Sequence, residues 1–414
     1  VGFDASYEFV GNDGKLFYVK TDKDAPRGKL LGISLDKPAP SSWTTLLAER
    51  EDKLEGVAMR GGGLLAFWLH NAHDKVTFHK KSGDEVREVG LPVIGNVSGF
   101  SGRSTDNEVF YALTSFTYPS TIFHLDLKTG ASTEYRRAKV DFEPDAYETR
   151  QVFFTSKDGT QVPMFLVHKK GIEPTGDHPT YLYGYGGFNI SLQPTFSVPI
   201  VAWLEQGGVY AQPSLRGGGE FGETWHEAGM LEKKQTVFDD FASAAEWLIQ
   251  NGITQSSRLA IGGGSNGGLL VGASITQRPD LFGAAVAQVG VLDMLRFHRF
   301  TIGHAWVSEY GSADDPKMFD VLHGYSPLHN VKAGQRYPAT LITTADHDDR
   351  VVPAHSFKFA ATLQEAQAAG GPPVMIRIDT KAGHGAGKST TKQIEEVADR
   401  YAFVLHALGA APKP

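Results

Sequence analysis

A serine between glycines is the residue best suited to nucleophilic chemistry in this chain. Ser265 lies in Gly263-Gly264-Ser265-Asn266-Gly267, which matches the pattern G-x-S-x-G. The apolar run Leu259–Gly262 precedes it and a stretch of small residues follows it, so the serine joins an expected strand to an expected helix. We therefore predict that Ser265 is a nucleophile on a strained turn. The alternative is a tight turn whose serine caps the following helix.

A serine hydroxyl is a weak nucleophile unless a histidine, held by a carboxylate, removes its proton. In a strand-to-helix arrangement of this type the chain order is serine, acid, histidine. His384, between two glycines, follows the expected strand Val374–Ile378 and only one further helix comes after it. His347 and His355 are alternatives, but they lie on or just after the loop that carries the acid. That one loop would then have to supply both the acid and the base. The order therefore favours His384 as the base.

The acid is expected in the loop Ala345–Arg350, directly after the expected strand Ala339–Thr344. This loop contains three carboxylates, Asp346, Asp348 and Asp349, and their spacing does not choose between them. Ligand sites of α/β sheets form at the carboxyl ends of the strands. The acid loop and the histidine loop are therefore expected at the same edge of a sheet.

Other chemistries fit the sequence less well. The stretch Gly383–Ser389 resembles a phosphate-binding loop, but position 382, where the first required glycine would fall, is Ala382. His70 and His73 lack a third ligand and no H-E-x-x-H occurs, so we predict no metal and no cofactor. The chain has 0 cysteines, which excludes disulfides and cysteine nucleophiles.

The elements around Ser265 alternate between strands and helices. The segment 238–249 places Phe238, Phe241, Ala245, Leu248 and Ile249 on one face at helical spacing. Segments 357–364 and 394–408 have the same character. The expected strands are Pro179–Gly184, Gly208–Ala211, Leu259–Gly262, Ala284–Gln288, Ala339–Thr344 and Val374–Ile378. This alternation predicts an α/β fold, with a largely parallel sheet covered by helices on both faces.

The first part of the chain, up to about Lys139, has a different period. Strand-like runs at Lys15–Val19, Leu64–Leu69 and Glu108–Leu113 recur about every 45 residues, each with a second run downstream. Paired strands at this period are typical of propeller blades, although a β-sandwich is an alternative. Three blades cannot close a ring, which needs at least about four. We therefore expect that the chain starts within a propeller, and its first residue, Val1, is consistent with that.

Composition limits the class of protein. The chain has 414 residues, 40 Lys+Arg against 47 Asp+Glu, a net charge of −7 and 41% hydrophobic residues, as expected for a soluble globular protein of two or three domains. The long uncharged window Leu259–Gln277 is interrupted by glycines and polar residues, so no membrane segment is predicted. Basic runs are short and nucleic acid is not an expected partner. Cytoplasm and periplasm remain open as compartments.

Six blocks of sequence resemble the prolyl oligopeptidase family. They are Tyr183–Phe188, Arg216–Gly222, Gly263–Gly268, Gln277–Asp280, Asp346–Pro353 and Ala382–Lys388. The resemblance implies a serine peptidase with an α/β-hydrolase domain and a seven-bladed propeller, which cleaves short peptides after proline. An N-terminal segment and about four blades of that architecture have no counterpart in this chain.

The resemblance also implies roles for individual residues. Ser265 would be the nucleophile, Asp348 the acid and His384 the base. The backbone N–H of Asn266 and the hydroxyl of Tyr185 would stabilise the oxyanion. Arg350 would contact a substrate carbonyl. The proline pocket would consist of Phe188, Val291, Trp306, Tyr310 and Val351.

The sequence thus predicts propeller blades over residues 1–139 and an α/β-hydrolase catalytic domain over residues 140–414. The predicted function is a monomeric serine endopeptidase that cleaves short proline-containing peptides after proline through an acyl-enzyme. Alternatives are an oligopeptidase of basic specificity, a carboxylesterase, and a non-catalytic propeller interaction module. Basic specificity would favour acidic residues in the pocket, where the aromatic side chains of Trp306, Phe188 and Tyr310 are expected instead.

Overall fold

The computed structural model describes residues 4–385 and 388–411. The chain divides into two compact units. The first comprises Val1–Asp145 with the short segments Ser191–Ser197 and Gly219–Trp225. The second comprises Ala146–Ile190, Val198–Gly218 and His226–Pro414. The first unit therefore includes two segments from far along the chain, which no local sequence pattern indicates.

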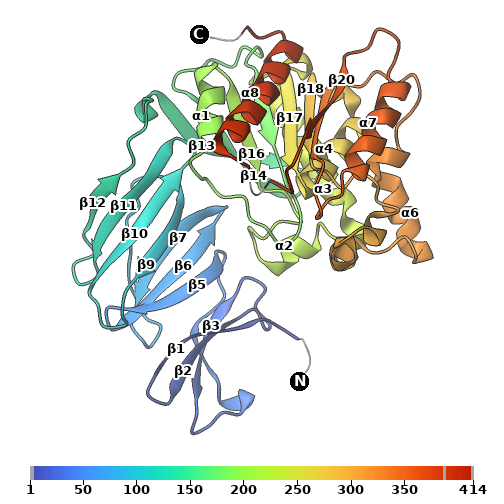
Figure 1. The fold of residues 1–414 in the computed structure, drawn as a ribbon. Coiled ribbons are helices and arrows are strands. Elements are labelled where there is room, and N and C mark those ends of the chain that lie inside the picture. Colours follow the sequence, from blue (N-terminus) through green and yellow to red (C-terminus); the bar gives the residue numbers. More distant parts are fainter. Residues whose placement is uncertain (1–3, 386–387, 412–414) are drawn as a thin grey trace. The chain divides into compact units, whose positions relative to one another are not determined.

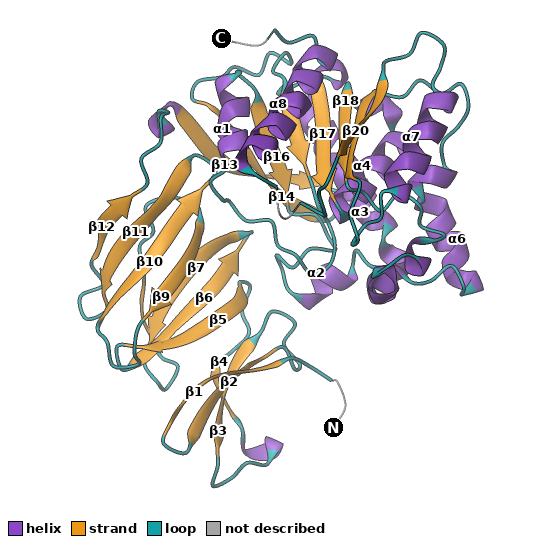
Figure 2. Cartoon of the chain, viewed as in Figure 1, coloured by secondary structure: helices purple, strands orange, loops and turns teal. Residues whose placement is uncertain are grey.

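The first unit contains three four-stranded antiparallel sheets, each built from consecutive strands (Figure 2). The first sheet has β1 (Tyr7–Asp13), β2 (Leu16–Thr21), β3 (Lys29–Ser34) and β4 (Thr44–Leu47). The second has β5 (Lys53–Arg60), β6 (Gly63–His70), β7 (His73–His79) and β8 (Glu85–Glu88). The third has β9 (Asn96–Ser101), β10 (Glu108–Ser115), β11 (Tyr118–Asp126) and β12 (Ser132–Arg137). Each sheet contains one of the three strand-like runs expected from the sequence, in β2, β6 and β10.

Adjacent sheets of this unit share apolar cores. Tyr18 and Leu30 of the first sheet pack in one buried cluster with Leu54 and Trp68 of the second. A second cluster joins the second sheet to the third and includes the stacked rings of Phe100 and Tyr111, whose centroids lie 4.7 Å apart. Strand β6 of the second sheet alternates between its two faces, so that Leu64 and Trp68 pack in the first cluster and Leu65 packs in the second.

The two short segments join this unit through hydrogen bonds. The amide of Gln193 donates to Asp74 Oδ1 at 2.6 Å, and Asn96 donates to Gln193 Oε1 at 2.8 Å. Leu192 donates its backbone N–H to Glu220 Oε1 at 2.9 Å, which ties the first segment to the second. The residues in these three contacts lie 119, 97 and 28 positions apart in the sequence, so no local pattern indicates them.

The second unit is built on an eight-stranded sheet with the order β13-β14-β16-β15-β17-β18-β19-β20 (Figure 1). Six parallel strands form most of it, namely β15 (Thr180–Tyr183), β16 (Val209–Pro213), β17 (Leu259–Gly264), β18 (Ala284–Gln288), β19 (Ala339–Ala345) and β20 (Val374–Asp379). The sequence predicted all six. The antiparallel hairpin of β13 (Tyr147–Thr155) and β14 (Gln161–Lys169) was not predicted.

Helices cover both faces of this sheet. Figure 1 shows α1 (Val198–Glu205) and α8 (Thr390–Ala407) on one face, where Trp203 and Tyr401 pack together with ring centroids 5.4 Å apart. The opposite face carries α3 (Gln235–Gln250), α4 (Asn266–Gln277) and α7 (Ala354–Ala366). Shorter helices are α2 (Glu223–Glu227), α5 (Val307–Tyr310) and α6 (Pro316–Tyr325). The predicted α/β-hydrolase architecture is confirmed.

The helix predicted at 238–249 extends from Gln235 to Gln250. Phe238, Phe241, Ala245 and Leu248 are buried as the spacing indicates, whereas Ile249 is half-buried.

In the part of the chain that the structure describes, no helix combines the length and apolarity needed to cross a bilayer.

Candidate active site

Ser265 occupies the turn between β17 and α4. Its backbone has φ 58° and ψ −116°, in the left-handed region that non-glycine residues rarely adopt. A Cβ on Gly263 would lie 2.4 Å from the carbonyl oxygen of Gly267, and a Cβ on Gly267 would lie 2.6 Å from that of Gly184. The glycines are therefore required by close backbone approach. The side chain of Ser265 makes no capping hydrogen bond to α4, which argues against the capping alternative.

His384 and Asp348 are brought together from two loops at the carboxyl ends of β19 and β20. His384 Nδ1 lies 2.6 Å from Asp348 Oδ2. The carboxylate of Asp348 is buried, and its other oxygen accepts the backbone N–H groups of Arg350 at 3.0 Å and Val351 at 2.9 Å. These bonds fix the orientation of the carboxylate and leave one oxygen for the imidazole. The pair has the geometry of an acid that orients a histidine base.

The competing carboxylates and histidines have other surroundings. Asp346 pairs with His347 at 2.7 Å, and the histidine side chain is 71% exposed. Asp349 is exposed. His355 is buried, its Nδ1 accepts the backbone N–H of Asp293 at 3.0 Å, and burial lowers its pKa to about 4. The structure pairs neither His347 nor His355 with Asp348 by a hydrogen bond, so the described loops offer His384 as its partner.

Ser265 lies at a cavity of about 280 Å³. The lining residues are Tyr185, Phe188, Ile190, Ser265, Val291, Ile302, Trp306, Tyr310 and Arg350. Aromatic rings dominate it: Phe188 and Tyr310 meet edge to face with centroids 5.4 Å apart. Among the described residues, Arg350 is the one charged side chain in the lining, and no carboxylate lines the cavity. Because Arg350 lies two residues after Asp348, the acid loop reaches the same cavity as Ser265.

The structure places the predicted substrate residues as follows. Phe188, Val291, Trp306, Tyr310 and Arg350 line the cavity, whereas Val351 is buried, does not line it and donates its backbone N–H to Asp348. Ile190 and Ile302 line the cavity as well, and the sequence reasoning missed them. Both are single apolar residues in loops, which lack the periodicity that would have identified them.

Tyr185 and Asn266 flank Ser265. The Tyr185 hydroxyl is hydrogen bonded to the Ser265 side chain, and burial raises the pKa of the phenol, so the hydroxyl keeps its proton near neutral pH. Asn266 is the first residue of α4, where backbone N–H groups have no acceptor within the helix. Its side chain donates to Tyr185 O at 2.6 Å and accepts from the Tyr310 hydroxyl at 2.8 Å. Both residues expected to supply oxyanion donors thus adjoin Ser265.

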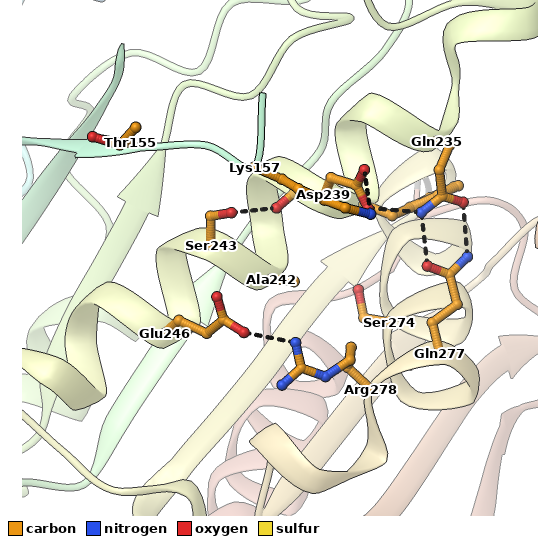
Figure 3. A pocket seen from close by; sticks show the side chains of 11 residues that line it. Thr155, Lys157, Gln235, Asp239, Ala242, Ser243, Glu246, Ser274, Gln277 and Arg278 are labelled. Atoms are coloured by element: carbon orange, nitrogen blue, oxygen red, sulfur yellow. Dashed lines mark hydrogen bonds and ion pairs between the residues drawn. The ribbon is translucent and has the colours of Figure 1, made fainter. Parts of the chain in front are cut away.

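A second, larger cavity of about 550 Å³ lies elsewhere in the second unit, between α3, α4 and the end of β13 (Figure 3). Its polar groups already have partners. Gln235 and Gln277 bond to each other through both amides, at 2.9 and 3.0 Å, and Arg278 pairs with Glu246 at 2.6 Å. Within the described part of the chain, no histidine lines it to act as a base. This cavity therefore does not provide the elements of a nucleophilic site.

Metal and phosphate sites are less well supported. Within residues 4–385 and 388–411, no group of three or more His, Asp or Glu side chains is placed to hold a metal ion. The stretch Gly383–Ser389, considered above as a phosphate-binding loop, includes Ala386 and Gly387, which lie outside the described residues.

The fold and the site together define a protein that joins β-propeller blades to an α/β-hydrolase domain, in which Ser265 occupies a strained strand-to-helix turn. Comparison with known proteins identifies the family. The profile of the prolyl oligopeptidase family matches residues 194–411, and that of the N-terminal beta-propeller domain of prolyl oligopeptidase matches residues 1–138. The chain belongs to the prolyl oligopeptidase family.

Individual relatives cover nearly the whole chain. Prolyl endopeptidase from Elizabethkingia meningoseptica is 48% identical over 409 residues, covering 99% of this chain and 58% of that protein. The dual function macrocyclase-peptidase POPB from Galerina marginata is 41% identical over 413 residues, covering 98% and 56%. The chain thus spans less than two thirds of the length of these relatives.

Solved structures agree in fold. A structure from a study of two prolyl endopeptidases aligns with a TM-score of 0.94 at 45% identity, covering 99% of this chain and 60% of that one. Prolyl oligopeptidase B from Galerina marginata, solved with a 35mer hydrolysis and macrocyclization substrate, also aligns with a TM-score of 0.94, at 40% identity over 100% of this chain and 59% of that one.

Proposed function

We propose that this chain is a serine endopeptidase that hydrolyses short peptides on the carboxyl side of proline. The observation that carries the proposal is the position of Ser265, on its strained turn, at an aromatic cavity that is also lined by Arg350 of the acid loop, in which Asp348 pairs with His384. Membership of the prolyl oligopeptidase family and the prolyl endopeptidases among its relatives support proline as the recognised residue.

In the proposed reaction, His384 Nε2 takes the proton of Ser265 Oγ while Oγ attacks the scissile carbonyl carbon. Asp348 accepts a hydrogen bond from the Nδ1–H group of His384. This bond leaves Nε2 unprotonated to act as the base, and it stabilises the imidazolium that forms. The imidazolium then gives its proton to the leaving amine as the C–N bond breaks, which forms an acyl ester on Ser265. Water, deprotonated by the same histidine, attacks the ester and regenerates the serine.

Two donors would stabilise the tetrahedral intermediate. The carbonyl oxygen becomes an oxyanion during attack, and donors already aimed at it act without reorganisation. We assign this role to the Tyr185 hydroxyl and the Asn266 backbone N–H, which adjoin Ser265. The raised pKa of Tyr185 keeps the donor proton in place over the working pH range.

The cavity accounts for the choice of proline. A pyrrolidine ring is apolar and carries no charge, so the flat face of Trp306 and the ring of Phe188 are suitable contacts for it. A lysine or arginine would be desolvated there without a carboxylate, at a cost of several kcal/mol. Arg350, at the edge of the cavity, is placed to donate to a substrate carbonyl. All proposed residues come from one chain, so a monomer suffices.

The test combines labelling with matched substrates. A fluorophosphonate should label the wild-type chain at Ser265 and fail to label Ser265→Ala, whose hydrolysis of a proline chromogenic peptide should fall by about 10⁶ in kcat with the fold unchanged. Circular dichroism of both proteins controls for folding. Activity of Ser265→Ala at a tenth of wild type would refute the nucleophile assignment.

The alternatives are outcomes of the same test. Faster cleavage after arginine than after proline would indicate an oligopeptidase of basic specificity. Hydrolysis of simple esters but not peptides would indicate a carboxylesterase. A wild-type chain that neither reacts with the fluorophosphonate nor cleaves any substrate would indicate an interaction module.

A further inference from the structure

The loop Tyr185–Phe188 carries two parts of the proposed site, the oxyanion donor Tyr185 and the pocket wall Phe188. It follows β15 and belongs to no helix or strand. Gly186 has φ 65°, Phe188 has φ 59° and Asn189 has φ 56°, all in the left-handed region. Two of these are not glycine, so the loop does not rest in its preferred conformation and needs bonds from its surroundings to stay there.

Three side chains bond to the backbone of this loop. Asn266 Nδ2 donates to the carbonyl of Tyr185 at 2.6 Å. Lys234 Nζ donates to the carbonyl of Gly186 at 2.8 Å. The N–H of Phe188 donates to Glu309 Oε1 at 2.9 Å. Three of four consecutive residues are thus held by side chains from α4, from the start of α3 and from α5.

Lys234 and Glu309 form a buried charged pair behind the loop. They are 1% and 4% exposed, and Lys234 Nζ lies 4.0 Å from Glu309 Oε1. Glu309 Oε2 also lies 2.8 Å from His226 Nε2, and the ammonium lies 5.5 Å from the centroid of Tyr310. Neither Lys234 nor Glu309 lines the cavity.

Stability alone does not account for these charges. Replacing a buried ion pair by apolar residues of similar volume is often neutral or stabilising, because both charges must be desolvated. The pair does, however, satisfy one backbone carbonyl and one backbone N–H of a strained loop. The need to hold the loop in one position therefore explains the buried pair better than stability does.

We propose that Lys234 and Glu309 are positioning residues that fix the backbone of the Tyr185–Phe188 loop and so hold the oxyanion donor and the pocket wall in one geometry. The catalytic part of this inference rests on the proposed peptidase function. The structural part, that the pair holds the loop, does not. The two parts are tested separately.

The first experiment is hydrogen–deuterium exchange, which needs no activity. Lys234→Met keeps an unbranched side chain that is one atom shorter and removes the donor, and Glu309→Ala removes the acceptor. Deuterium uptake in the peptide covering residues 184–190 should be faster in both variants, and uptake in β18 should be unchanged. Arg278→Met, which removes a cation paired with Glu246 at the larger cavity, is the matched control and should leave the loop unchanged. Unchanged loop uptake in both variants would overturn the proposal.

The second experiment is a double-mutant cycle with Tyr185→Phe. A loop displaced by about an ångström costs on the order of a hundredfold in rate, so Lys234→Met and Glu309→Ala should each lower kcat by tenfold to a hundredfold. If they act through the Tyr185 hydroxyl, the same changes in a Tyr185→Phe background should cost at most a few-fold. A purely structural role would give equal losses in both backgrounds and would contradict the proposal.

Glu309→Gln keeps an oxygen that can accept the N–H of Phe188 and should retain most of the activity lost in Glu309→Ala. If Glu309→Ala fails to fold, as judged by its melting temperature, Glu309→Gln takes its place in the experiments. A loss of kcat in Glu309→Gln as large as in Glu309→Ala would overturn the role of the bond to Phe188. A wild-type chain without prolyl peptidase activity would refute the proposed function, while the exchange experiment would still decide whether the pair holds the loop.

Discussion

At the residue scale, the three carboxylates of the acid loop differ in burial and partners. Asp348 is buried, bonded to His384 and held by two backbone N–H groups, whereas Asp349 is exposed. We expect Asp348→Asn to lower kcat by about 10⁴, because the amide no longer orients the imidazole. Asp349→Asn is the matched control and should have a far smaller effect. Steady-state kinetics on a proline chromogenic peptide provides the measurement, and a reversed ranking would move the role to Asp349.

The specificity pocket gives a second prediction at this scale. Trp306 lines the cavity, and its ring lies roughly parallel to that of Phe297, with centroids 6.5 Å apart. Trp306→Ala should raise KM and narrow the preference for proline over alanine, because the flat apolar face is lost. Basic substrates should remain poor in both enzymes. The measurement is kcat/KM on peptides that differ only at the residue before the cut, and an unchanged ratio of proline to alanine would contradict the prediction.

How far the sequence could predict the site differs from residue to residue. Ser265 could be predicted from the sequence because the strand, the turn and the helix follow one another in the chain and the glycine pattern is local. The choice between Asp346, Asp348 and Asp349 was not, because it depends on which carboxylate meets a loop 36 residues away. Lys234 and Glu309 escaped notice for the same reason, since a charged residue in a sequence shows no sign that it is buried.

At the scale of elements, the β13–β14 hairpin is tied to α3 by a buried network. Asp240 of α3 is fully buried, and its carboxylate accepts from Arg216 Nε at 3.0 Å, from Arg216 Nη2 at 2.6 Å and from the Ser156 hydroxyl at 2.5 Å. Arg216 also pairs with Asp158 of the hairpin turn at 2.5 Å. The network thus links the hairpin, the loop after β16 and the helix.

Asp240→Asn should therefore lower the free energy of unfolding by about 3 kcal/mol, because it leaves the buried guanidinium with a single carboxylate partner. Asp239→Asn, one residue earlier on the same helix, removes a pair with the exposed Lys157 at 3.4 Å and should cost less than about 1 kcal/mol. Urea denaturation followed by tryptophan fluorescence compares the two. Equal losses would show that burial of the network does not determine its contribution.

The hairpin itself marks a limit of sequence reasoning. In β14, Pro163 interrupts an apolar run, and proline normally argues against a strand between two neighbours. Yet β14 pairs with both β13 and β16, and the carbonyl of Pro163 accepts the N–H of Ser214 at 2.9 Å. The parallel strands could be predicted because each is a short apolar run followed by a helix. The hairpin has no helix between its strands, so this alternation is absent there.

At the scale of the whole molecule, the 45-residue period indicated paired strands in the first part of the chain, but not the segments 191–197 and 219–225 that join this unit from further along the chain. These segments contain no strand, and the second contributes a buried carboxylate, Glu220. Glu220 is 1% exposed; its Oε1 accepts the N–H of Leu192, and its Oε2 has no hydrogen-bond partner within the described part of the chain. A buried carboxylate with one unbonded oxygen is costly in its charged form.

Burial accordingly raises the pKa of Glu220 from 4.5 to about 7. The hydrogen bond from Leu192 and the positive charge of Lys53 lower this pKa, but their effect is smaller than that of burial. Below pH 4.5 the carboxyl is protonated in the folded and the unfolded chain and makes no difference to stability. Between pH 4.5 and about 7 the unfolded chain releases the proton and the folded chain keeps it, so stability falls as pH rises. Above pH 7 the penalty is complete.

Glu220→Gln removes this charge and should stabilise the first unit at pH 8 by roughly 3 kcal/mol, with a much smaller gain at pH 5. The measurement is the urea midpoint of the unit that contains Glu220, at both pH values. Glu51→Gln, an exposed carboxylate of the same unit, is the control and should change neither midpoint. A Glu220→Gln protein less stable than wild type at pH 8 would mean that the carboxylate is stabilised by its surroundings, and the burial argument would fail.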